Sequence, residues 1–183
     1  GYRTISAPST ALLNLQRTIY KRVLLSASIH PTCMGFRQSI SVADNARVHL
    51  GNQQLLKIDI SDFFGSIKKN RVIQTFEKIG YPTTIAQVLS ELCILEGKLP
   101  QGAVTSPTLS NIVAYNVNVQ LVALAQKHQL KYTRYADDLT FSGSEIEFDI
   151  IIPQIKDILR SEGFIIQRKK TRILTAKKRK IVT

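Results

Sequence analysis

Apolar residues recur at the spacing of an amphipathic helix in several parts of the chain. In the first of these segments Leu12, Leu15 and Ile19 share one face, and Ser9 or Thr10 stands before them with a side chain able to cap a helix. Basic residues occupy the opposite positions, so the outer face of this helix is positively charged. The same pattern predicts further helices over 42–50, 70–79, 84–95, 107–126 and 148–161.

Two stretches have the composition of β-strands and carry acids at their ends. Residues 55–60 form a compact apolar run with Asp59 near its end, which is typical of a buried central strand that delivers a carboxylate to an edge of a sheet. Residues 132–142 form a second β-forming run, interrupted at its midpoint by Asp137 and Asp138, which we expect at a hairpin tip. With a further strand at 164–166, this order predicts an α+β sheet with helices on one face, the ferredoxin-like layout.

The charge of the chain indicates a polyanionic partner. It has 25 Lys and Arg against 13 Asp and Glu, a net charge of +12. The excess is uneven, because residues 167–180 hold eight basic side chains and no acidic one. Nucleic acid is the partner that this pattern favours.

The remaining composition is that of a protein from a reducing compartment. Cys33 and Cys93 match neither a disulfide framework nor a metal-ligand spacing. There is no signal peptide and no apolar run long enough to span a bilayer, so we expect a cytoplasmic protein without a membrane partner. The first residue is not Met, and we interpret the chain as an excised piece of a longer protein.

Three carboxylates are the candidate chemistry. Asp137 and Asp138 are adjacent charges that need a positive partner, and oxygen ligands gathered at one point suit Mg²⁺. If their strands neighbour the strand that ends at Asp59, two Mg²⁺ ions held between the acids could activate a 3′-hydroxyl and steady a leaving pyrophosphate. The same sequence pattern also fits an ordinary solvated hairpin and a separate acid at the end of another strand. Composition and spacing therefore reach two-metal phosphoryl transfer on nucleic acid as one interpretation and go no further.

The motifs around these acids resemble those of reverse transcriptases. Tyr135-Ala-Asp137-Asp138 is similar to the polymerase signature of that family. The accompanying motifs stand in the family's order: Arg3 to Pro8, Gly35-Phe-Arg, Ile58 to Phe64, Leu99-Pro-Gln101-Gly102 with Ser106-Pro107, Gly163-Phe, and Lys169-Lys170-Thr171. A narrower resemblance is to bacterial retron enzymes, carried by Asn45-Ala-Arg-Val-His49 and by Leu139-Thr-Phe-Ser142.

The resemblance implies the fold class and the domains. It implies an α+β polymerase of the right-hand type, whose palm is a ferredoxin-like antiparallel sheet backed by helices. Residues 1–50 are then an incomplete fingers subdomain. Residues 51–183 are the palm, with a helical insertion of the fingers at about 68–100. The thumb is expected to be absent, which puts the activity of this piece alone in doubt.

The resemblance also implies the site. Asp59, Asp137 and Asp138, with the backbone carbonyl of Ile60, hold two Mg²⁺ ions, for which Mn²⁺ is a substitute. Lys170 is the general acid for pyrophosphate, with Lys169 as a rival in the same basic run. Four further positions are implied to bind the nucleotide: Arg3, Phe64, Gln101 and Gly102.

Each of these residues also has a plain structural interpretation. Phe64 is either a gate against a ribose 2′-hydroxyl or a core aromatic beside Phe63. Gln101 and Gly102 suit a simple turn as well as a nucleotide pocket, and Arg3 at a chain end suits a solvated charge. His49 is expected to hold a helix or loop by hydrogen bonding rather than to take part in chemistry.

The function implied is RNA-directed DNA synthesis of the retron type, on a structured non-coding RNA in the bacterial cytoplasm, with a role in defence against phage. The implied partners are an RNA template, an RNA/DNA hybrid, deoxynucleoside triphosphates and a retron effector protein. A group II intron, diversity-generating or abortive-infection reverse transcriptase is the enzymatic alternative. A basic RNA-binding module with structural acids is the alternative from another class, although paired exposed aromatics of an RNA-recognition signature are missing.

Overall fold

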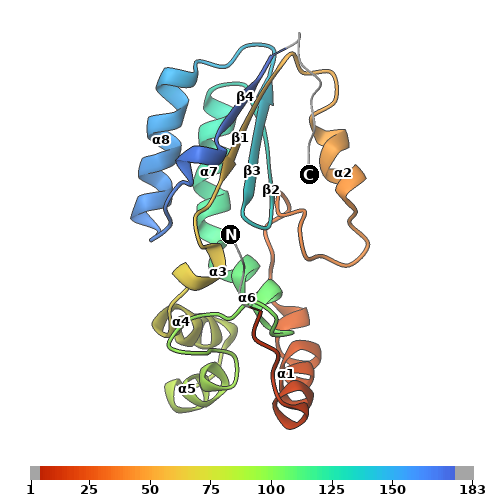
Figure 1. Ribbon diagram of the computed structural model, residues 1–183, viewed down its shortest axis with the longest axis vertical. Coiled ribbons are helices and arrows are strands. Elements are labelled where there is room, and N and C mark those ends of the chain that lie inside the picture. Colours follow the sequence, from red (N-terminus) through yellow and green to blue (C-terminus); the bar gives the residue numbers. More distant parts are fainter. Residues whose placement is uncertain (1–4, 176–183) are drawn as a thin grey trace. The chain divides into compact units, whose positions relative to one another are not determined.

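The computed structural model describes residues 5–175, except for the side chain of Arg168, and divides them into two compact units (Figure 1). Unit 1 contains residues 5–29 and 62–114, and unit 2 contains residues 30–61 and 115–175. The sequence grouped residues 30–50 with the first helix. In the structure they pack with the sheet of unit 2, where residue 33 forms a parallel bridge to Arg134.

Unit 1 is helical. Its first helix begins as expected, because the Ser9 hydroxyl accepts a hydrogen bond from the amide of Leu12. Its second long helix ends at Ile79 and is capped by Gly80, whose φ of 116° is a conformation that glycine adopts without strain. The elements of the unit are α1 (Thr10–Arg22), η1 (Leu24–Ser26), α3 (Phe63–Ser66), α4 (Lys69–Ile79), α5 (Thr83–Glu91) and α6 (Ser106–Val113).

Unit 2 is a four-stranded antiparallel sheet with helices. The strands β1 (Gln54–Asp59), β2 (Lys131–Tyr135), β3 (Asp138–Gly143) and β4 (Arg172–Leu174) lie in the order β2-β3-β1-β4. Figure 1 shows α7 (Tyr115–Lys127) and α8 (Phe148–Ser161) together on one face and α2 (Val42–Val48) on the other. A short turn of helix, η2 (Arg168–Lys170), precedes β4. The expected α+β sheet backed by helices is confirmed.

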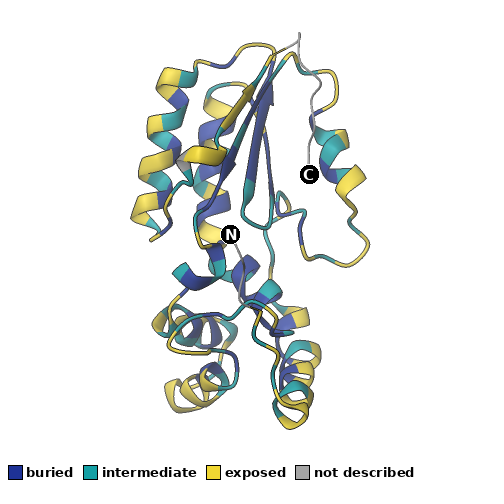
Figure 2. Cartoon of the chain, in the orientation of Figure 1, coloured by how far each residue is buried: buried dark blue, intermediate teal, exposed yellow. Residues whose placement is uncertain are grey.

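The two faces of the sheet differ in chemistry because side chains alternate along each strand. Apolar residues at successive even positions, Leu56 and Ile58, are fully buried, and the neighbouring Phe141 packs on Tyr132, whose hydroxyl reaches α7. Figure 2 shows the strands of the sheet largely in the colour of buried residues. The opposite face carries polar side chains. They include Lys57 and Asp59 of β1 and Asp138, Thr140 and Ser142 of β3. The sheet therefore presents its acids on the face that α7 and α8 do not cover.

Two sequence expectations were wrong in detail. The helix predicted over 107–126 is broken at Ala114, whose φ of −83° and ψ of 10° end α6. Apolar spacing continues across this residue, so periodicity could not detect the break. The strand predicted at 164–166 contributes only an isolated bridge between Ile166 and Ile60. The edge of β1 is instead paired with β4, a short and largely exposed strand of the kind that sheet edges tolerate.

Within residues 5–175 every helix is too short or too polar to cross a membrane.

Candidate active site

The ends of β1 and β3 bring the predicted acids together. Asp59 is the last residue of β1 and lies directly opposite Asp138, the first residue of β3, in the antiparallel register. The amide of Ile60 donates a hydrogen bond to the carbonyl of Asp137, with an N–O distance of 2.9 Å. Asp59 therefore meets the adjacent Asp137 and Asp138, which are far from it in sequence, at one corner of the sheet of unit 2.

The turn that carries two of these acids differs from the expected one. The residues between the strands are Ala136 and Asp137, whereas Asp138 already belongs to β3. Ala136 has a φ of 57°, in the left-handed region that residues with a Cβ seldom adopt. Asp137 thus lies in the turn and Asp138 in a strand, so the two carboxylates extend from backbones of different conformation.

The acids share one electrostatic environment. Burial raises the pKa of Asp137 above its ordinary value, and the charges of Asp59 and Asp138 raise it further, while Lys170 acts in the opposite direction. The Lys170 ammonium lies 2.9 Å from Asp59 and the Lys57 ammonium 3.3 Å from Asp138. Two lysines therefore lie against a concentration of negative charge.

The donor set fits a hard divalent cation. Carboxylate and carbonyl oxygens are the ligands that Mg²⁺ and Mn²⁺ take, and the mutual repulsion around Asp137 is of the kind that a cation relieves. Among residues 5–175 there is, however, no group of three or more His, Cys, Asp or Glu side chains already arranged around a common point. Because Lys57 and Lys170 contact the acids, binding of cations requires these ammonium groups to shift.

Lys57 is a site residue that the sequence analysis missed. It stands in the middle of an apolar run, two residues before Asp59 and therefore on the same face of β1. A single charged residue inside an otherwise apolar strand was the available signal. Lys169 and Lys170 are both exposed, and the ammonium of Lys170 contacts Asp59.

The two nucleotide-binding candidates on the loop before α6 belong to unit 1. Gly102 has a φ of 112°, and a Cβ at this position would lie 2.7 Å from the carbonyl oxygen of Ser6. The amide of Ser6 donates to the carbonyl of Gln101 at 2.8 Å. Glycine is therefore required here by the chain's own backbone. Gln101, Ser6 and Asp62 are among the residues that line a pocket of this unit.

Phe64 is more exposed than its neighbour Phe63. Phe63 is 3% exposed and belongs to the core of unit 1, whereas Phe64 is only partly buried, with the two rings 5.6 Å apart. The pair thus divides into a core aromatic and a partly accessible one, and the core role falls to Phe63. The fourth candidate, Arg3, lies outside the described residues.

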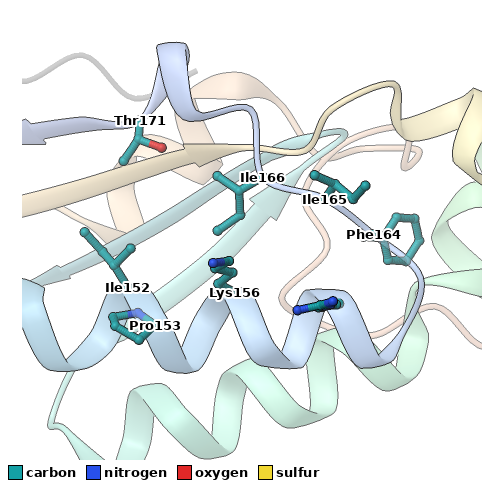
Figure 3. A pocket seen from close by; sticks show the side chains of 8 residues that line it. Ile152, Pro153, Lys156, Phe164, Ile165, Ile166 and Thr171 are labelled. Carbon is teal, nitrogen blue, oxygen red and sulfur yellow. The ribbon is translucent and has the colours of Figure 1, made fainter.

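A second pocket lies on unit 2, between α8 and the segment that follows it (Figure 3). Its walls are mainly apolar, with Ile152, Phe164 and Ile166 pointing into it and Lys156 beside them. None of the predicted site residues lines this pocket.

The motif that resembles retron enzymes has a structural role in unit 2. His49 follows α2 and is 4% exposed. Its Nδ1 lies 2.7 Å from the hydroxyl of Ser142 and its Nε2 lies 2.7 Å from the hydroxyl of Thr133. The imidazole therefore bridges β2 and β3 beneath α2, as expected for a residue that holds an element in place. Burial, with a smaller contribution from Lys131, lowers its pKa to about 4.

The chain is similar in sequence to reverse transcriptases. The family model described as reverse transcriptase (RNA-dependent DNA polymerase) matches residues 1–182. The chain is 36% identical over 182 residues to the Retron Ec86 reverse transcriptase of Escherichia coli, covering 99% of this chain and 57% of that protein. It is 33% identical over 192 residues to the Retron Mx65 reverse transcriptase of Myxococcus xanthus, covering 94% and 45%. The chain thus spans about half the length of these relatives.

Solved structures with the same fold include telomerases. The apo telomerase of Candida tropicalis aligns with a TM-score of 0.59 at 11% identity, over 90% of this chain and 35% of that one. The telomerase of Candida albicans in complex with a fragment of telomeric RNA aligns with a TM-score of 0.55 at 12% identity, over 93% and 34%. At such identities the likeness is one of fold.

Proposed function

The chain belongs to the reverse transcriptase (RNA-dependent DNA polymerase) family, and from this membership we propose that it forms the nucleotidyl-transfer part of a retron-type enzyme that copies RNA into DNA. In this proposal unit 2 is the palm and unit 1 belongs to the fingers of a right-hand polymerase. The main support for this proposal is that Asp59 and Asp138 are direct partners in the strand register. Ile60, the residue after Asp59, also donates a hydrogen bond to the carbonyl of Asp137.

The acids are proposed to act together on divalent cations. Asp59, Asp137, Asp138 and the carbonyl of Ile60 would hold two Mg²⁺ ions, or Mn²⁺ in their place, and the ions supply Lewis-acid stabilisation of the charge that develops during nucleotidyl transfer. The residues of the chain position the 3′-end and the triphosphate. The pairing of β1 with β3 fixes the backbones of Asp59 and Asp138, and the ammonium groups of Lys57 and Lys170 shift away from these acids when the cations bind.

Lys170 is proposed to change partners during the reaction. In the structure its ammonium lies against Asp59, 2.9 Å from a carboxylate oxygen. Its side chain is about half exposed, so it can leave this carboxylate without losing solvation. Released from Asp59, a Lys170 ammonium near the leaving pyrophosphate can donate a proton to it, which is the role of a general acid.

The deoxynucleotide is proposed to bind through unit 1. Gln101 and Gly102 contribute the loop whose backbone is held by Ser6, and Arg3 contributes a guanidinium suited to a triphosphate. Phe64 is the proposed gate against the 2′-hydroxyl, which its partial exposure permits.

Replacing Phe64 with Ala is expected to relax sugar selectivity. A bulky ring that clashes with a 2′-hydroxyl costs a ribonucleotide about 1–3 kcal/mol, so its removal should raise ribonucleotide over deoxynucleotide incorporation by about 5- to 150-fold. The measurement is the ratio of kcat/KM values for one base in its ribo and deoxy forms. Phe64→Tyr, which keeps the ring, should retain the original ratio, and an unchanged ratio in Phe64→Ala would remove the gate assignment.

The function itself is tested with the full-length protein on a primed RNA template. We expect incorporation of deoxynucleotides that depends on the template base, stops when EDTA removes the divalent cations, and returns when Mg²⁺ or Mn²⁺ is added in excess. A catalytically inert protein that still binds the RNA would favour the RNA-binding module instead. Incorporation that persists in EDTA would contradict the metal role of the acids.

The retron type adds a template and partners to this proposal. It rests on the identity to the retron enzymes named above and on the buried His49 of the retron-like motif. A structured non-coding RNA is then the template, an effector protein the partner, and defence against phage the biological role. Nucleic acid that copurifies with the intact protein should be a branched RNA–DNA hybrid. A linear product would instead favour a reverse transcriptase of the group II intron, diversity-generating or abortive-infection kind.

A further inference from the structure

Arg134 is a buried cation directly beneath the candidate site. It belongs to β2, and its exposed fraction is 0%. A guanidinium is costly to remove from water unless all its donors find acceptors in fixed positions. Because a guanidinium donates in fixed directions, a buried one can hold several acceptors in a defined arrangement.

The donors of Arg134 reach three separate segments of unit 2. Nη1 donates to the carbonyl of Ala136 in the turn at 2.9 Å, and Nε donates to Oδ1 of Asn118 in α7 at 3.0 Å. Nη2 donates to Sγ of Cys33 at 3.3 Å. The planar fork of the guanidinium therefore ties the turn to a helix and to the segment that pairs with β2.

The turn needs this support because it is held in an unfavourable conformation. Ala136 has a φ of 57°, and nothing in its own side chain compensates for the left-handed backbone. Two successive carbonyls of the turn accept hydrogen bonds from outside it, that of Ala136 from Arg134 and that of Asp137 from the amide of Ile60. Gly35 packs from another side, where a Cβ would lie 2.6 Å from the amide nitrogen of Ala136.

We propose that Arg134 is a positioning residue for the nucleotidyl-transfer reaction: by fixing the carbonyl of Ala136 it holds the left-handed turn that sets the directions of the Asp137 and Asp138 carboxylates. The inference rests on the proposed function, since it assigns to Arg134 the preorganisation of acids that bind divalent cations. Arg134 acts through the turn and does not touch the substrates. Mg²⁺ tolerates little deviation from octahedral geometry, so small displacements of the acids weaken its binding.

The test replaces Arg134 with Lys in the full-length protein. Lysine keeps the charge but offers a single ammonium, which cannot reach the turn, Asn118 and Cys33 together. Loss of the bond to the turn is expected to raise the Kd of Mn²⁺, measured from the free-ion signal in electron paramagnetic resonance, by about tenfold. In primer extension the same variant should have a lower kcat and an unchanged KM for the deoxynucleotide.

Tyr132→Phe is the matched control. The Tyr132 hydroxyl also donates to Oδ1 of Asn118, at 3.0 Å, so this variant removes a hydrogen bond from the same buried cluster but none from the turn. Its Mn²⁺ Kd should stay within about twofold of the original, because the hydrogen bond from Arg134 to the turn is kept. Asn118→Ser removes the acceptor that orients Nε and should raise the Kd in the same direction as Arg134→Lys, which keeps the inference testable should the lysine variant not fold.

The outcomes separate the two proposals. An unchanged Mn²⁺ Kd in a folded Arg134→Lys, or in Asn118→Ser if the lysine variant does not fold, overturns the positioning role and leaves the proposed function standing. An equal rise in Tyr132→Phe overturns it as well, because the effect is then a general loss of packing. If Asp138→Asn does not weaken Mn²⁺ binding to the otherwise unaltered protein, the metal role of the acids fails, and the inference fails with it.

Discussion

Replacing Asp138 with Asn is expected to reduce RNA-templated DNA synthesis by about 10³-fold or more while leaving RNA binding in place. The amide has the size of the carboxylate but lacks its charge and one of its two acceptor oxygens, so a divalent cation is held less tightly and the local negative potential falls. Asp59→Asn is expected to have an effect of the same order, because the two residues are register partners on β1 and β3. The measurement is single-turnover incorporation by the full-length protein at saturating Mg²⁺.

A matched control for this prediction is Asp157→Asn. Asp157 is an exposed residue of α8, so the substitution changes the net charge by the same amount without altering the acids at the sheet corner. Its activity should stay close to that of the original protein. Activity of Asp138→Asn comparable to that of the control would contradict the metal role, whereas parallel loss of RNA binding would indicate a folding defect instead.

The meeting of the acids could be predicted from the sequence because two local patterns limit where they lie. An apolar run that ends in Asp59 is typical of a central strand of a sheet. A β-forming run interrupted by Asp137 and Asp138 is typical of a hairpin. Periodicity reports which side of an element is buried. It does not report the partner of that side, and the pairing of β1 with β3 entered through the resemblance of the motifs.

The contacts that tune the site could not be predicted in this way. Lys57 and Arg134 are charged residues in strands, and the default for such residues is a solvated position. In the structure Lys57 contacts Asp138, and Arg134 is completely buried beneath the turn. Both contacts depend on which segments the fold brings beside the strand, and for Arg134 these segments include Asn118 and Cys33, which are distant in sequence. The left-handed conformation of Ala136 could not be predicted either, because alanine has no preference for it.

Acidification is expected to destabilise the protein through His49. Its pKa is about 4 in the folded protein and about 6.5 when the chain is unfolded and the imidazole is solvated. Above pH 6.5 neither state binds the proton, and the stabilising contribution of the neutral imidazole is fully present. Between pH 6.5 and 4 the unfolded state binds the proton and the folded state does not, so stability falls as the pH falls. The total loss is about 3 kcal/mol, from about 1.4 kcal/mol for each unit of pKa shift.

The measurement compares urea unfolding of the full-length protein and of His49→Gln between pH 7.5 and 4.5. Glutamine does not titrate, and the carboxylates common to both proteins cancel in the difference of their unfolding free energies. At pH 7.5 the original protein should be more stable, because its imidazole is hydrogen-bonded to Ser142 and Thr133. This advantage should shrink by about 2–3 kcal/mol on reaching pH 4.5. A difference that does not vary with pH would mean that His49 is solvated in the native protein, and that the imidazole does not join α2 to β2 and β3.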